Sequence, residues 1–191
     1  MDLFFKILLL AGWGIAIAQS HAGTQVYFSP NGGCETQAAQ LISKAKSTLD
    51  IAVYSLNNPA IVSAISAAAK RGVKIRVLTD RTQAFGKGNL DATRTLATLG
   101  QNFRVHSKNR IMHNKFGIAD GKLMMTGSFN WTRSAEQAND ENCMITDDSN
   151  IVVSFKKRFE THLWVVNTLE KSQKYLGTRG IGMIHRKTAG K

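Results

Sequence analysis

Strand-like runs alternate with helix-like segments along the first half of the chain, and this alternation constrains the fold more than any other feature. Runs rich in β-branched and aromatic residues predict strands over residues 24–28, 49–55 and 73–79. After the first of these strands, residues 35–46 place apolar side chains at i, i+3, i+4 and i+7, which is one face of a helix. After the second, Asn58 and Pro59 form an N-cap with proline at the first helical position, which predicts a helix through Arg71 that ends at Gly72. This order predicts an α/β domain whose parallel strands are covered by helices.

The second half of the chain continues with a helix and then with several short strands. We predict a helix over residues 89–99, strands over 103–106, 112–119, 122–126 and 141–146, and a long amphipathic helix over 150–170. Asp120 and Gly121 separate two of these strands and are a strong signal for a two-residue turn. We therefore expect these two strands to form a β-hairpin.

The two ends of the chain differ in composition from the domain between them. Residues 7–18 are 12 uncharged residues, which suits an export signal but falls short of the about 20 residues that span a bilayer. We predict a cleavable signal over residues 1–22, with an uncleaved anchor as the alternative, and a single domain over residues 23–170. The product is expected to be periplasmic or secreted, without stable membrane association. Residues 171–191 hold six Lys/Arg and no acid, which predicts either a flexible basic tail that tracks phosphates or a solvated tail without a partner.

The charge balance indicates the kind of partner. The chain carries 25 Lys+Arg against 13 Asp+Glu, a net charge of +12. Such an excess favours a polyanion, which means nucleic acid or, less often, an anionic membrane surface. Two cysteines are too few for a disulfide-dense scaffold or a four-cysteine zinc site. Cys34 and Cys143 either form a disulfide in an oxidising compartment or remain two buried thiols, and both alternatives stay open.

Residues 112–132 concentrate the polar residue types that phosphate chemistry needs. On a strand, His113 and Lys115 stand at i and i+2 and so project from one face. Beyond the hairpin, Ser128 and Asn130 repeat this spacing. A histidine, an ammonium, a hydroxyl and an amide on neighbouring strand ends form a candidate oxyanion site, and the local excess of basic residues attracts an anion to it.

The spacing His113-x-Lys115-x4-Asp120, followed by Ser128-x-Asn130 in the phrase GSFNWT, resembles the HKD signature of the phospholipase D superfamily. Among its members, the chain most resembles the small, single-motif bacterial endonucleases. The resemblance implies an α/β fold in which a mixed β-sheet is flanked by helices on both faces. It implies that His113 attacks phosphorus and that water then hydrolyses the phosphohistidine, with no metal and no other cofactor. Lys115 and Asn130 would hold the non-bridging oxygens, with Ser128 as a supporting donor.

Two acids belong to the expected site. Glu141 stands where related nucleases carry a glutamate that is hydrogen-bonded to the catalytic imidazole, so it would fix the tautomer of that ring. Asp120 is part of the signature. It follows His113 by seven residues and lies at the hairpin turn, so it should face away from His113. We count Asp120 among the site residues and interpret its role as structural.

The mechanism that the resemblance implies needs a second histidine to protonate the leaving oxygen, yet the motif occurs once. We therefore predict a symmetric homodimer that brings His113 of both chains to one site. His106 is the alternative second histidine. The remaining histidines stand outside any such motif: His21, His162 and His185.

DNA is the expected substrate and partner, with RNA as a further candidate, because the basic groups are numerous. Contacts to phosphates carry no sequence information, so cleavage should be nonspecific and should weaken as salt rises. Trp131 either stacks on a base or belongs to the core. The alternatives are a lipid phosphodiesterase of the same superfamily, a non-catalytic nucleic-acid-binding protein, and a metal-dependent nuclease, for which the acids around His113 show no ligand spacing.

Overall fold

The computed structural model describes residues 23–99, 102–106 and 111–164. Seven strands form one mixed sheet in the order β1-β7-β6-β5-β2-β3-β4. The strands are β1 (Thr24–Ser29), β2 (Thr48–Val53), β3 (Lys74–Thr79), β4 (Phe103–Val105), β5 (Lys115–Ala119), β6 (Leu123–Gly127) and β7 (Glu141–Thr146). The predicted export signal and basic tail lie outside the described residues.

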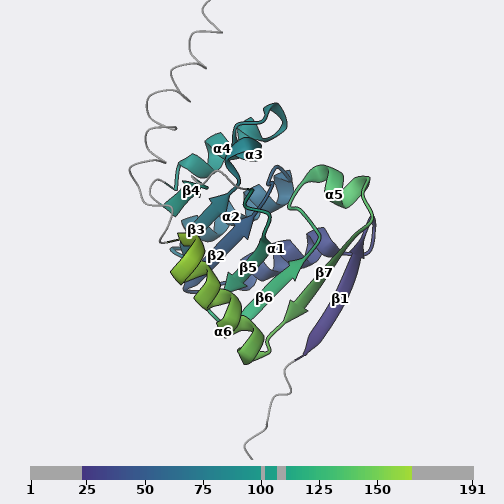
Figure 1. Ribbon diagram of the computed structural model, residues 1–191, viewed down its shortest axis with the longest axis vertical. Coiled ribbons are helices and arrows are strands. Elements are labelled where there is room, and N and C mark those ends of the chain that lie inside the picture. Colours follow the sequence, from purple (N-terminus) through teal and green to yellow (C-terminus); the bar gives the residue numbers. More distant parts are fainter. Residues whose placement is uncertain (1–22, 100–101, 107–110, 165–191) are drawn as a thin grey trace, which may run out of the picture.

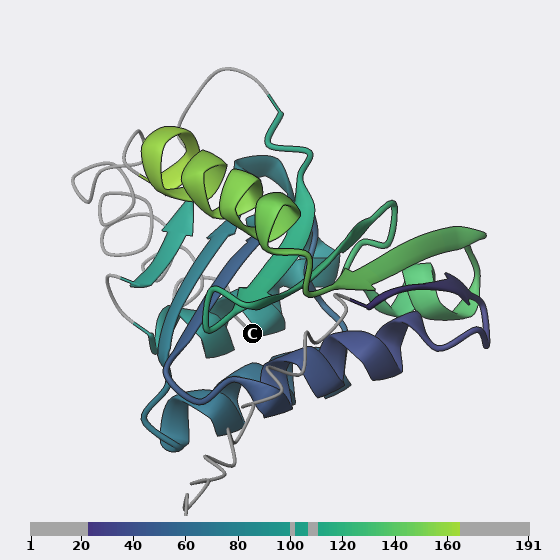
Figure 2. The same cartoon turned by 90° about the horizontal axis from the view of Figure 1, so that it is seen from below.

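Helices cover both faces of the sheet (Figures 1 and 2). On one face, α1, α2 and α4 pack on a large apolar cluster, and on the other face α6 and η3 pack on a smaller one. The helices are α1 (Cys34–Lys44), α2 (Pro59–Lys70), α3 (Arg81–Ala84), η1 (Lys87–Asn89), α4 (Leu90–Ala97), α5 (Arg133–Gln137), α6 (Ser149–Arg158) and η3 (Phe159–Trp164). The mixed sheet with helices on both faces is the architecture that the resemblance implied. Within the described residues, no helix has both the length and the apolar character needed to cross a bilayer.

Local signals fixed the start of α2 and the turn of the hairpin. The Asn58 side chain accepts hydrogen bonds from the backbone N–H groups of Ala60 and Ile61, which caps α2 as predicted. Asp120 and Gly121 both have positive φ, 54° and 65°, so they form the primed type of turn that joins antiparallel strands. The hairpin of β5 and β6 is therefore confirmed.

Strand β1 departs from the expected parallel arrangement. Only β2, β3 and β4 run parallel to one another, whereas β1 pairs antiparallel with β7 at the far edge of the sheet. The physical reason is the path of α1, which contacts β1, β7, β6 and β5 on its way to the middle of the sheet. A strand, a helix and a strand in sequence do not require the two strands to be neighbours.

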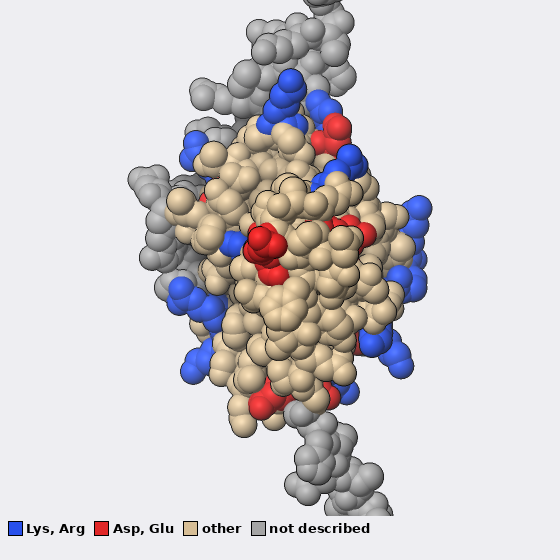
Figure 3. Space-filling model, turned by 90° about the vertical axis from the view of Figure 1, so that its right-hand side faces the viewer, with Lys and Arg blue, Asp and Glu red and all other residues tan. Residues whose placement is uncertain are grey.

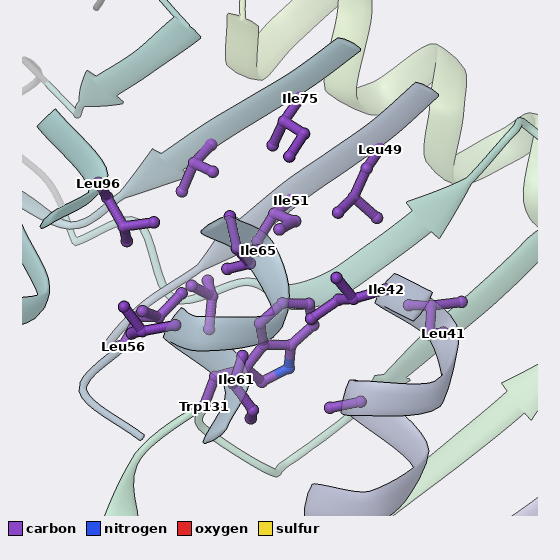
Figure 4. Close-up of a cluster of buried hydrophobic side chains, with 14 of the residues drawn as sticks. Leu41, Ile42, Leu49, Ile51, Leu56, Ile61, Ile65, Ile75, Leu96 and Trp131 are labelled. Atoms are coloured by element: carbon purple, nitrogen blue, oxygen red, sulfur yellow. The ribbon is translucent and has the colours of Figure 1, made fainter. Parts of the chain in front are cut away.

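The larger apolar cluster surrounds a buried tryptophan. Figure 4 shows Trp131 among aliphatic side chains of α1 and α2, including Ile42 and Ile61. Cys34 at the start of α1 and Cys143 in β7 form a disulfide in the same cluster, with their Cα atoms 5.9 Å apart. The structure thus selects the disulfide from the two alternatives that the sequence left open.

Candidate active site

The upper edge of the sheet in Figure 1 is formed by the carboxyl ends of β2, β3, β4 and β6 together with the amino ends of β5 and β7. Pairing in β2, β3 and β4 is parallel, and β5, β6 and β7 alternate in direction from there. As a result, the ends of β2 and β6 lie beside the starts of β5 and β7. Tyr54 follows β2 and Ser128 follows β6, whereas His113 lies two residues before β5 and Glu141 is the first residue of β7.

His113 lies two residues before β5, because the strand predicted over 112–119 begins only at Lys115. Both neighbours of His113 in the chain are tethered. The backbone N–H of Met112 donates to Oδ2 of Asp80 at 3.1 Å, and the carbonyl of Asn114 accepts from the backbone N–H of Tyr54 at 2.8 Å. The imidazole itself is exposed and meets the Tyr54 ring edge-on, with ring centroids 4.6 Å apart. An exposed imidazole on a tethered backbone is suited to nucleophilic attack on a substrate from solvent.

Lys115, the first residue of β5, is buried to 9% exposure beneath this histidine. Its ammonium donates to the backbone carbonyl of His113 at 2.9 Å and lies 5.2 Å from the centre of the Tyr54 ring. Burial lowers the pKa of Lys115, and the negative charge of Glu141 opposes this shift in part. The site therefore holds a positive charge beside the nucleophile, where the charge on a phosphate would develop.

A β-bulge presents Ser128. The backbone N–H groups of Ser128 and Phe129 both donate to the carbonyl of Asn142, at 3.1 and 3.2 Å. Gly127 has a φ of 151°, and a Cβ at this position would collide with the Asn142 carbonyl, so the bulge requires glycine here. The Ser128 hydroxyl accepts from the N–H of Asn142 at 3.0 Å, which holds the bulge in place.

Asn130 carries the amide that the sequence pattern singled out. Its Oδ1 is buried and has no hydrogen-bond partner within the described part of the chain. The two residues that flank Asn130, Phe129 and Trp131, are both buried in the larger cluster. Because its neighbours are fixed, Asn130 is held in place, and its unpaired Oδ1 is an acceptor that a donor group could satisfy.

Glu141 begins β7 at the same edge but does not contact the imidazole. Its carboxylate accepts from Nδ2 of Asn139 at 3.0 Å, and within the described residues no hydrogen bond joins it to His113. Strand β6 lies between β5 and β7, which separates the two strands by about 10 Å. The interaction of Glu141 with this site is electrostatic, since its negative charge favours the charged form of Lys115.

Asp120 and Trp131 lie apart from this constellation. Asp120 is at the opposite edge of the sheet, where its carboxylate accepts from the backbone N–H groups of residues 46, 47 and 48. Burial would raise the pKa of Asp120, but these hydrogen bonds outweigh burial and lower it. Trp131 is 1% exposed, so it is a core residue, and the interpretation that it stacks on a base is corrected.

His106 does share the upper edge but cannot complete the site within one chain. It follows β4, and its backbone N–H donates to the carbonyl of Thr79 at 2.9 Å. Strands β2 and β3 lie between β4 and β5, so about 14 Å separate β4, which His106 follows, from β5, which His113 precedes. The His106 side chain is buried as well, which leaves it unsuited to protonate a leaving group beside His113.

Tyr54 and Asp80 belong to the site and were missed in the sequence. Each follows the carboxyl end of a parallel strand, β2 or β3. That position is where open α/β sheets collect functional residues, so it was the signal that could have found them. Within the described residues, no group of three His, Cys, Asp or Glu side chains is placed to hold a metal ion.

The family model and the solved structure that match this chain both carry phospholipase D descriptions. A family model described as cardiolipin synthase, PLD-like domain, matches residues 38–164. The structure of Nuc from Salmonella typhimurium, described as a phospholipase D family member, superposes with a TM-score of 0.69 and 30% identity, over 77% of this chain and 94% of that one.

Two sequence relatives carry related descriptions. The mitochondrial cardiolipin hydrolase of Xenopus tropicalis is 36% identical over 124 residues, which cover 65% of this chain and 58% of that protein. The phospholipase D of Rickettsia conorii is 32% identical over 136 residues, which cover 71% of this chain and 67% of that protein. The chain thus spans less than two thirds of the length of the cardiolipin hydrolase.

Proposed function

From the premise that this chain belongs to the phospholipase D superfamily, whose members include phosphodiesterases, we propose that it is a metal-independent endonuclease. Its proposed substrate is DNA of any sequence, with RNA as a further candidate. The observation that carries the proposal is the exposed imidazole of His113 above the buried ammonium of Lys115, with Ser128 and Asn130 at the same sheet edge.

The proposed reaction proceeds in two steps. A neutral nitrogen of His113 attacks phosphorus, the bond to the leaving oxygen breaks, and that oxygen takes a proton from an acid. Water then attacks the phosphohistidine and releases His113 together with the phosphomonoester product. The ammonium of Lys115 and the Nδ2 N–H group of Asn130 donate to the non-bridging oxygens and stabilise their charge in both steps.

We propose that a homodimer supplies the acid. The leaving oxygen needs a proton donor on the side opposite the nucleophile, and in this chain His106 is too far from His113 to serve. The partner subunit's His113 would donate this proton and then accept one from the attacking water. A two-fold axis beside the sheet edge would bring both imidazoles to one phosphate.

Charge supports nucleic acid as the substrate. The net charge of +12 favours a polymer of phosphates over a single lipid headgroup. On the face that carries β1, Lys and Arg side chains stand around the margin and leave the centre to uncharged and acidic residues (Figure 3). We therefore place the nucleic acid along the upper sheet edge and not on this face.

A lipid phosphodiesterase is the second candidate. It is favoured by the 36% identity to a protein described as a mitochondrial cardiolipin hydrolase. The two candidates share the phosphodiester and the nucleophile and differ in what flanks them. We also propose that residues 1–22 direct export and that residues 171–191 add affinity for phosphates.

The test is nicking of plasmid DNA in excess chelator. We expect the wild type and His162→Ala to cleave, and His113→Ala to lose at least about 10³-fold in rate, because a nucleophile is removed. Activity that disappears with chelator would contradict the metal-independent mechanism. Hydrolysis of cardiolipin vesicles without cleavage of DNA would select the lipid candidate, and binding of DNA with no cleavage by any variant would select the non-catalytic one.

A further inference from the structure

We propose that Tyr54 is a positioning residue for the reaction, which holds the His113 imidazole in the orientation for attack. The proposal rests on the nucleophilic role of His113 proposed above. Within the described residues, the His113 side chain makes no hydrogen bond, and its contact with the Tyr54 ring at 4.6 Å is the interaction that defines its orientation. The ring planes meet at 61°, the edge-on geometry that aromatic pairs prefer.

The backbone of Tyr54 is tied to the same segment as its ring. Its N–H donates to the carbonyl of Asn114, the residue after His113, at 2.8 Å. Its own carbonyl accepts from Oγ1 of Thr79 at 3.2 Å and from the N–H of Asp80 at 3.4 Å. Tyr54 therefore cannot shift relative to His113 without breaking hydrogen bonds to two neighbouring strands.

The hydroxyl group of Tyr54 is fixed from a third direction. Nε2 of Gln83, in α3, donates to this hydroxyl at 3.0 Å. The N–H of Gln83 donates to Oδ1 of Asp80 at 3.3 Å, and Oδ2 of the same carboxylate accepts from the N–H of Met112, the residue before His113. Tyr54, Gln83 and Asp80 thus form a closed bracket that begins and ends at the two neighbours of His113.

A polar network beneath the bracket holds Gln83 in turn. Nδ2 of Asn89 donates to the carbonyl of Gln83 at 2.8 Å and to Oγ of Ser55 at 3.2 Å. Asn89 and Ser55 are both buried, so these hydrogen bonds are protected from water and keep α3 in register with the end of β2.

The bracket serves orientation and not binding. An exposed histidine samples several rotamers, and attack requires one that points a ring nitrogen at phosphorus. The Tyr54 ring also lies 5.2 Å from the Lys115 ammonium, within reach of a cation–π contact. One aromatic ring therefore contacts both the nucleophile and the cation beside it.

The experiment measures the ring of His113 and the reaction separately, in the full chain. The ε1 resonance of the His113 imidazole is recorded by NMR without substrate, and kcat and KM are measured with bis(p-nitrophenyl) phosphate, which is neither lipid nor nucleic acid. The variants are Tyr54→Leu, which removes the ring, Tyr54→Phe, which keeps it, and Gln83→Ala. Tyr27→Leu is the matched control, because Tyr27 lies on β1.

We expect Tyr54→Leu to displace the His113 resonance and to lower kcat about tenfold with KM nearly unchanged. Tyr54→Phe should keep the resonance within the wild-type range and lose at most about threefold in kcat. Gln83→Ala should match Tyr54→Phe, and the double variant should lose no more than either, since all remove the same hydrogen bond. Tyr27→Leu should leave the resonance and kcat unchanged.

An unmoved His113 resonance in Tyr54→Leu would overturn the proposal whether or not the protein is a nuclease. A moved resonance with unchanged kcat would also overturn it, because orientation would then not matter for the reaction. If Tyr54→Leu fails to fold, the comparison of Gln83→Ala with Tyr54→Phe decides. Losses of kcat that add up in the double variant would contradict the bracket, because both variants would then act independently. Full activity of His113→Ala, by contrast, would refute the proposed nucleophile. The NMR result would then still decide whether Tyr54 orients the His113 ring.

Discussion

Replacing Lys115 with methionine should separate catalysis from stability. Methionine has nearly the length of lysine and fills the buried stem position, but it removes the ammonium beside His113. A cation or donor that stabilises charge developing on a reacting oxygen contributes about 10²–10³ in kcat, or about 3–4 kcal/mol. We therefore expect Lys115→Met to lose about that factor in the hydrolysis of bis(p-nitrophenyl) phosphate.

Stability should change little, because two effects oppose each other. The variant loses one hydrogen bond, from the ammonium to the carbonyl of His113, worth about 1 kcal/mol. It also removes a charge whose burial is unfavourable, as the lowered pKa of Lys115 shows. We expect the free energy of unfolding, measured with urea at neutral pH, to change by less than about 1 kcal/mol.

The pH dependence of stability gives the sign of the burial effect. Because the pKa of Lys115 is lowered in the folded state, the unfolded chain binds this proton more tightly. The free energy of unfolding of the wild type should therefore rise relative to Lys115→Met as the pH climbs from the lowered value toward the ordinary lysine value of about 10.4.

Lys122→Met is the matched control, since Lys122 is exposed at the hairpin turn on the opposite edge of the sheet. It should keep kcat within about twofold of the wild type. The reasoning is refuted if Lys115→Met retains activity. It is equally refuted if the variant loses more than about 2 kcal/mol of stability in step with activity, because Lys115 would then be a structural residue.

Three further predictions follow from the same contacts. At alkaline pH, kcat/KM should decline at a pH below the ordinary pKa range of lysine, because the pKa of Lys115 is lowered. In Lys115→Arg the decline should move to higher pH, because arginine stays charged. A decline that does not move would belong to another group. Asp120→Ala should lose about 1–3 kcal/mol of stability at pH 7 with unchanged kcat, because three backbone N–H groups lose their acceptor. Since the pKa of Asp120 is lowered in the folded state, this difference should be largest above about pH 3.9 and shrink as the pH falls through the lowered value. The part that comes from alanine at a positive φ should remain, and a fall in kcat would restore a catalytic role. Trp131→Leu should lose about 2–4 kcal/mol in thermal or urea unfolding, with an unchanged KM for a single-stranded oligonucleotide, whereas a raised KM in a stable variant would indicate base stacking.

Much of the site was predictable because its signals are local. His113 and Lys115 are two residues apart, as are Ser128 and Asn130, and the Asp120-Gly121 turn returns the chain so that both pairs reach one edge. The cap at Asn58 and the full extent of β7 were likewise predicted from neighbouring residues.

The remaining features depend on contacts between distant segments. The place of β1 follows from its antiparallel pairing with β7, more than a hundred residues later. The ring of Tyr54 meets His113 only because β2 and β5 are neighbours in the sheet. The pairing of Cys34 with Cys143 likewise depends on where α1 crosses β7. No local pattern encodes these relations.

The central claim is a covalent bond between phosphorus and His113, and trapping that intermediate tests it most directly. Wild-type protein and His113→Ala are mixed with a labelled phosphodiester, quenched within one turnover under conditions that preserve phosphohistidine, and digested for mass spectrometry. We predict a phosphorylated peptide whose modified residue is His113, absent from His113→Ala and also seen in the control His162→Ala. Turnover without any phosphorylated histidine, or with the label on another residue, would contradict the account.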